Sequence, residues 1–152
     1  MTTPRSRPGK RAISYLRART VNGDDRYISG QFAAQRAVCQ HLADVYGANI
    51  VQEFTAVGGA REPYVRHIVN IMCQHAAAEH ADYVITANLD RLCRGPAEAD
   101  DEVLHAIDDS GARLLCGTIW DAAPPGPHMD SLISAARRFG EQLRPLVARR
   151  IA

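Results

Sequence analysis

Four short apolar segments alternate along the chain with three longer segments in which apolar residues recur every three or four positions. Short apolar runs bounded by turn residues are typical of buried strands, whereas the longer spacing is typical of amphipathic helices. The predicted strands are residues 11–17, 49–54, 82–87 and 113–116, and the predicted helices are residues 31–46, 63–76 and 96–110. Strands that alternate with helices form βαβ units. The order therefore predicts an α/β fold with a mostly parallel sheet of four to five strands and helices on both faces.

Glycine and proline residues mark the expected ends of the helices. Gly47 and Gly111 follow the last periodic residues of the first and third helices, where glycine readily adopts the left-handed conformation that ends a helix. Pro63 and Pro96 stand at the first positions of the second and third helices, where no backbone donor is needed. Local chemistry and apolar spacing thus predict the same boundaries.

The carboxyl ends of the predicted strands carry charged residues. In open parallel sheets, ligands bind outside these ends. Arg17 and Arg19 lie at the end of the first strand, and Asp90 and Arg91 follow the third. We therefore expect these side chains to gather at one edge of the sheet.

The chain is long enough for one domain with its own core, expected over residues 11–122. Residues 1–10 are basic and contain prolines with no apolar stretch behind them, so we expect a disordered arm and not a signal peptide. No apolar segment approaches the roughly 18 residues needed to span a bilayer. These features predict a cytoplasmic protein that does not contact membranes.

Residues 127–150 differ in character from the rest of the chain, because their apolar residues follow the spacing of a helix seam. The seam residues are Leu132, Ala136, Phe139 and Leu143. Such spacing is typical of contact with a partner helix, which predicts a C-terminal oligomerisation helix and a homodimer. Packing of this helix against its own domain is the alternative. Pro145 would kink or end the helix.

Both ends of the chain are basic, although the net charge is only +1. Residues 1–20 contain six basic residues and no acidic one, and residues 130–152 contain five arginines and two acidic residues. A polyanion is therefore expected to contact the ends, although solvated basic tails would have the same composition. The four cysteines and six histidines follow neither C-x-x-C nor H-E-x-x-H spacing, so we expect no metal site and no cofactor.

Arg17, Arg91 and Arg94 would form a cluster suited to a phosphodiester. A planar guanidinium grips two phosphate oxygens and stays charged at any working pH. Positive charge placed in this way stabilises the transition state of phosphate chemistry. Asp90 would orient one of these arginines. A surface run of ion pairs is the alternative for residues 90–94.

Four motifs occur in a fixed order along the chain. They are Y-L-R-A-R at residues 15–19, Gln35 with Arg36, L-D-R-L-C-R at residues 89–94, and W-D-A-A-P-P-G at residues 120–126. Over about residues 11–144 this order resembles the catalytic domain of the serine recombinases, the resolvase and invertase family. The resemblance implies that Arg17, Asp90, Arg91 and Arg94 match phosphate-binding and catalytic residues and that Gln35 matches a glutamine near the active site. It also implies that the final helix is a dimerisation helix.

The chain departs from the family pattern at two positions. Arg19 occupies the position of the serine that attacks the phosphate in that family, and a guanidinium cannot form the resulting ester. Glu62 precedes Pro63 where the family usually has a phosphate-contacting arginine, so only the neighbouring Arg61 could substitute. Thr20 is the candidate for a substitute nucleophile.

The resemblance implies a role in DNA recombination, with alternatives for this chain. In the first, the protein is inactive and acts by oligomerisation and backbone contact with DNA, or by pairing with an active recombinase. Its phosphate contacts would be Arg17, Arg19, Arg61, Arg91 and Arg94. In the second, it is an active recombinase or strand-transferase that uses a nucleophile such as Thr20. A third is an interaction module that has abandoned DNA.

Overall fold

The computed structural model describes residues 9–20, 24–59, 62–92 and 97–118. The elements are β1 (Lys10–Ala18), α1 (Ile28–Tyr46), β2 (Ala48–Val57), α2 (Pro63–Ala78), β3 (Tyr83–Asn88), α3 (Leu89–Leu92), α4 (Ala97–Asp109) and β4 (Arg113–Thr118). The predicted strands and helices are all present, and α3 is a short helix that the sequence pattern does not predict. β1 begins at Lys10, the last residue of the predicted arm. The end of the predicted domain and the helix predicted over 127–150 lie outside the described residues.

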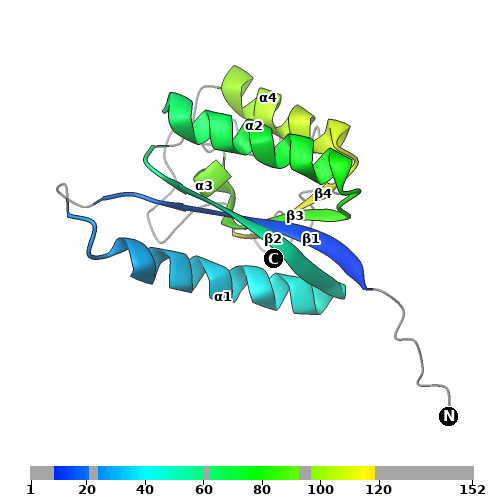
Figure 1. Cartoon of the computed structure of the whole chain (residues 1–152), viewed down its shortest axis with the longest axis horizontal. Coiled ribbons are helices and arrows are strands. Elements are labelled where there is room, and N and C mark those ends of the chain that lie inside the picture. The colour runs from blue at the N-terminus through cyan, green and yellow to red at the C-terminus, as the bar shows by residue number, and fades with distance from the viewer. Residues whose placement is uncertain (1–8, 21–23, 60–61, 93–96, 119–152) are drawn as a thin grey trace, which may run out of the picture.

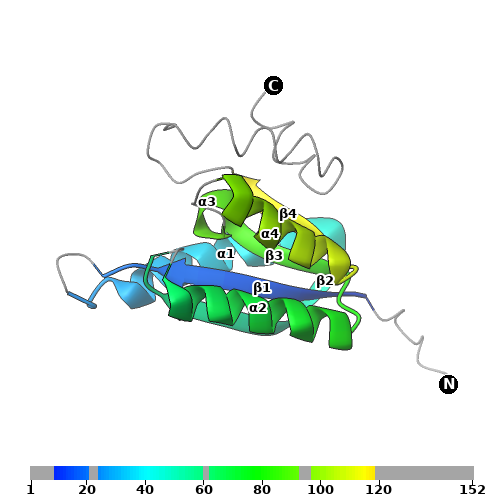
Figure 2. The same ribbon diagram turned by 90° about the horizontal axis from the view of Figure 1, so that it is seen from above.

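The four described strands form one parallel sheet in the order β2-β1-β3-β4. Helix α1 covers one face of the sheet, while α2 and α4 lie together on the other (Figures 1 and 2). The predicted α/β fold, with a parallel sheet between helices, is therefore confirmed. In this order β1 is an interior strand, paired with β2 on one side and with β3 on the other.

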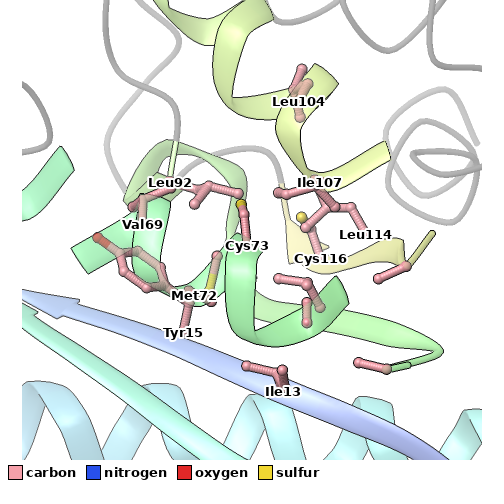
Figure 3. Close-up of a cluster of buried hydrophobic side chains, with 14 of the residues drawn as sticks. Ile13, Tyr15, Val69, Met72, Cys73, Leu92, Leu104, Ile107, Leu114 and Cys116 are labelled. Carbon is pink, nitrogen blue, oxygen red and sulfur yellow. The ribbon is translucent and has the colours of Figure 1, made fainter. Parts of the chain in front are cut away.

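Side chains of β1 alternate between two hydrophobic clusters. Ile13 and Tyr15 point into the larger cluster, which α2, α3 and α4 close from above the sheet (Figure 3). Ala12 and Leu16 pack against α1 in the smaller cluster. Because successive side chains of a strand point to opposite faces, Arg17 belongs to the same face as Tyr15. The alternation thus directs the first candidate site residue toward α2 and α3.

A β-bulge in β2 changes which of its side chains point toward α1. Ala12 pairs with Ile50 but Ile13 pairs with Gln52, so one residue of β2 has no partner in β1. An extra residue reverses the alternation of the strand. Before the bulge, Ile50 packs against the smaller cluster, on the α1 side of the sheet. After the bulge, Phe54 packs against the larger cluster, on the α2 side. The edge strand therefore contributes to both cores.

The bulge also directs Glu53 toward α1, where it forms a bidentate ion pair with Arg36. The Arg36 Nε and Nη2 atoms each donate to a carboxylate oxygen of Glu53 at 2.8 Å. This hydrogen bonding holds the pKa of Glu53 below its ordinary value. This ion pair links α1 to β2. It lies beside the smaller cluster, to which both elements contribute residues.

The helix ends follow the predicted chemistry. Gly47 has a φ of 67° and its N–H donates to carbonyl groups of the last turn of α1. Gly111 has a φ of 87°, and Pro63 is the first residue of α2. No helix among the described residues is both long and apolar enough to cross a membrane.

Candidate functional site

β1 extends further than β3 at the carboxyl edge of the sheet. β3 pairs with β1 only from Ala12 to Tyr15, and the chain then continues into α3. β2 stays paired with β1 as far as Ala18. On the side that faces β3, the backbone groups of Arg17 and Arg19 therefore have no strand to pair with, and side chains bind them instead.

Two glutamines of α1 take the place of the missing strand. The Gln35 Oε1 atom accepts from the Arg17 N–H at 3.0 Å, and its Nε2 atom donates to the Arg17 carbonyl at 2.8 Å. Gln31 makes the same pair of bonds with Arg19, at 3.1 and 2.7 Å. Residues four apart on a helix are displaced by about 6 Å along its axis, and residues two apart on a strand by about 6.6 Å. The two spacings match closely enough for adjacent glutamines to bind alternate residues of the strand.

The Arg17 side chain is buried at the centre of this edge, with 1% of its surface exposed. Its Nε atom donates to the Arg91 carbonyl at 2.7 Å, and its Nη1 atom donates to the Gly58 carbonyl at 2.8 Å. Arg91 returns a bond from its Nη1 atom to the Arg17 carbonyl at 3.1 Å. These bonds tie the end of β1 to α3 and to the segment after β2. Arg17 thus has a structural role, because it holds β1, α3 and the segment after β2 together.

Arg19 and Thr20 follow the last residue of β1, and both are exposed. Only the Arg19 backbone is held by Gln31, so its guanidinium is open to solvent. Of the other arginines described at this edge, Arg91 is half-buried and Arg17 is buried. Among these three, Arg19 is therefore the best placed to meet an anion from solution.

A carboxylate lies beside the segment that binds Arg17. Gly58 has a φ of 137°, and its N–H donates to the Ala18 carbonyl at 2.9 Å. The Glu62 carboxylate packs directly over Gly58, in the space that a Cβ atom at position 58 would occupy. Glu62 therefore brings negative charge to the part of the edge where the family resemblance implies an arginine.

The remaining predicted site residues are placed only in part. Asp90 lies in α3, but its side chain is outside the described part of the structure. Arg61 and Arg94 are also outside it, as are the seam residues Leu132, Ala136, Phe139 and Leu143. Within the described residues no group of three or more histidine, cysteine or acidic side chains could hold a metal ion. The described arrangement, in which arginines predominate, suits an anion.

Gln31 and Gly58 belong to the site although no sequence motif predicts them there. Gln31 and Gln35 did carry a signal, because two glutamines four apart on one helix face can bind alternate residues of a neighbouring strand. Gly58 contributes its carbonyl group, which no side-chain pattern reveals. The roles of both residues depend on how the chain leaves the sheet.

Two buried cysteines are unsuited to nucleophilic chemistry. Burial raises the pKa of the Cys39 thiol to about 12, with a smaller effect of the nearby Glu53, and burial raises that of Cys73 to about 11. Only the thiolate reacts as a nucleophile. We therefore expect iodoacetamide at about pH 8 to leave both thiols unlabelled in the native protein and to label them after unfolding in urea. Mass spectrometry of the tryptic peptides would report this, and rapid native labelling of Cys39 would contradict it.

No protein-family model and no curated protein sequence matches the chain. Solved structures do resemble it. The C-terminal catalytic domain of ISC1926 TnpA, an IS607-like serine recombinase, superposes with a TM-score of 0.58 at 14% identity, covering 82% of this chain and 77% of that one. A resolvase family site-specific recombinase from Streptococcus pneumoniae gives a TM-score of 0.58 at 20% identity, covering 89% and 91%.

The N-terminal catalytic domain of TP901-1 integrase is a third similar structure. Its TM-score is 0.53 at 18% identity, and the match covers 89% of this chain and 99% of that domain. Proteins of low sequence identity therefore share the overall fold of this chain. The chain has the fold of serine recombinase catalytic domains.

Proposed function

We propose that the protein is a serine-recombinase-like protein of DNA recombination that does not itself cleave DNA. It acts by oligomerisation and by contact with the phosphate backbone of DNA, or by pairing with an active recombinase. The proposed oligomerisation rests on the apolar seam predicted over residues 132–143, and homodimerisation is its simplest form.

The observation that carries the proposal is an exposed arginine where the family resemblance implies the nucleophilic serine. The backbone of residue 19 is held at the end of β1 by Gln31, while its side chain is in solvent. A guanidinium at this point attracts a phosphate. It cannot form the covalent phosphoester that strand exchange by a serine recombinase requires. Arg19 therefore favours binding without cleavage.

Two other features support binding without cleavage. Arg17 is buried and donates to the carbonyl groups of Gly58 and Arg91, so its guanidinium is less accessible to a phosphate than that of the exposed Arg19. The Glu62 carboxylate beside Gly58 would repel a phosphate that approached this side. We therefore assign backbone contact at this edge to Arg19, with Arg91 as a second contact.

Incubation with supercoiled plasmid tests the absence of cleavage. We expect no covalent protein–DNA adduct and no nicked plasmid after the reaction is stopped with detergent. Thr20→Ala is the matched variant: an adduct that forms with the wild type and disappears with this variant would establish the active-enzyme alternative. An adduct that persists in Thr20→Ala would refute inactivity and point to another nucleophile.

Salt titration of DNA binding tests the phosphate contacts in the same preparation. The logarithm of affinity should fall linearly with the logarithm of salt concentration, by about 0.9 per phosphate neutralised. Arg19→Ala should reduce this slope by about one unit. Arg113→Ala, at the opposite edge of the sheet, is the control and should leave it unchanged. Salt-independent binding, or none, would favour the interaction module that has abandoned DNA.

A further inference from the structure

The structure assigns to Gln31 the role of a positioning residue that sets the direction in which the Arg19 side chain leaves the sheet. The consequence for DNA affinity rests on the proposed function, whereas the positioning itself does not. Gln31 lies on the first turns of α1, and its carboxamide binds both the N–H and the carbonyl group of Arg19.

The two bonds act on one residue, and this makes them restrictive. The N–H and the carbonyl group of residue 19 flank its Cα atom, so binding both to one planar amide closes a ring through that atom. A single bond would leave the backbone free to rotate about the other torsion angle. With both bonds made, φ and ψ are fixed together and the Cα–Cβ direction is fixed with them.

Arg19 needs this restraint because it is the first residue beyond β1. On the other side of the strand, the last carbonyl held by the segment after β2 is that of Ala18, which accepts from the Gly58 N–H. Gln35 holds Arg17 in the same way, but Arg17 is also fixed by its own buried side chain. The exposed Arg19 side chain has no such packing. Its orientation therefore depends on the backbone bonds.

Glutamine is chemically suited to this role, because a carboxamide presents a donor and an acceptor on one rigid group. A glutamate at position 31 would have the same size but only acceptor oxygens, and one of them would face the Arg19 carbonyl. A leucine would remove both bonds. Gln31→Glu thus removes only the bond to the Arg19 carbonyl group, whereas Gln31→Leu removes both bonds.

A pre-oriented side chain loses less conformational freedom when it binds a ligand. Releasing the Arg19 backbone should therefore weaken DNA binding without removing any charge. We expect Gln31→Leu to lower DNA affinity by about threefold to tenfold. Gln31→Glu should lower it at least as much, because it also adds negative charge. The Gln31→Leu salt slope should stay closer to that of the wild type than the Arg19→Ala slope does.

Amide hydrogen exchange measured by NMR tests the positioning directly. We expect the Arg19 amide to exchange about tenfold faster in Gln31→Leu than in the wild type, whereas Gln31→Glu, which keeps an acceptor for the Arg19 N–H, should show a smaller change. The Arg17 amide, held by Gln35, should keep its rate. Gln40→Leu is the matched control, because Gln40 lies on the same helix and bonds only within it, to Asp44. Unchanged Arg19 exchange in Gln31→Leu would overturn the inference.

A double-mutant cycle on DNA affinity separates positioning from general damage. If Gln31 acts through Arg19, Gln31→Leu should have no further effect on affinity in an Arg19→Ala background. An equal loss in both backgrounds would indicate a merely structural role and overturn the inference. Failure of the wild type to bind DNA would overturn the proposed function instead, and the exchange rates would still decide whether Gln31 positions residue 19.

Discussion

Replacing Arg17 with methionine is expected to lower the free energy of unfolding by about 3 to 5 kcal/mol. Arg17 is 1% exposed, and its guanidinium donates to the carbonyl groups of Gly58 and Arg91. Methionine fills much of the same volume but leaves both carbonyl groups without this donor. Each buried acceptor that loses its partner costs about 1 to 3 kcal/mol. Urea unfolding followed by circular dichroism would measure the change.

Arg11→Met provides the control on the same strand. Arg11 lies near the start of β1, where its side chain is 48% exposed and pairs with Glu79. An exposed substitution of this kind changes the free energy of unfolding by no more than about 0.5 kcal/mol. Arg17→Lys should recover less than half of the loss, because one ammonium group cannot reproduce the forked geometry. A methionine variant as stable as the wild type would show that the cost of burying the charge equals the gain from its bonds.

Gln35→Leu is expected to lower the free energy of unfolding by about 2 to 3 kcal/mol. The side chain is 4% exposed and makes two bonds with the backbone of Arg17. Leucine keeps most of the volume but removes the acceptor for the Arg17 N–H. The Arg17 carbonyl retains its bond from Arg91, so the loss falls mainly on the N–H group. The same urea titration would measure it.

The comparison for Gln35 is Gln40→Leu, on the exposed face of α1, which should change stability by no more than about 0.5 kcal/mol. Gln35→Glu tests the direction of the bonds. A carboxylate can still accept from the Arg17 N–H but cannot donate to the carbonyl group, so its effect includes the cost of a buried charge. If Gln35→Leu and Gln40→Leu were equally stable, the backbone of Arg17 would not depend on the side chain of α1.

Much of the fold could be predicted from local sequence signals. Gly47, Pro63 and Gly111 act through backbone conformation, which each residue largely determines by itself, and the helix ends at these positions agree with prediction. The bulge in β2 could not be predicted, because it depends on pairing with β1. Ile50 and Phe54 are four apart in the strand and would share a face in a regular strand, yet they pack on opposite faces.

The candidate site was only partly accessible to sequence reasoning. Arg17 and Arg91 were expected at one edge of the sheet, and both Gln35 and Arg91 hydrogen-bond the backbone of Arg17 there; the roles that the resemblance implies for these residues stay predictions. The burial of Arg17 was not predictable, because it depends on two carbonyl groups from distant segments. From its charge, an arginine at a strand end is expected to be exposed and to bind phosphate. The groups that allow Arg17 to be buried are backbone carbonyls, which every residue has and which no sequence pattern reveals.

Gln31 and Gln35 bind the backbone N–H and carbonyl groups of Arg19 and Arg17 and make none of these bonds with their side chains. Position 19 can therefore exchange one amino acid for another while the surrounding scaffold keeps its shape and stability. A lineage that began with a reactive residue there would be able to abandon its chemistry in a single substitution, with no repair needed elsewhere in the architecture.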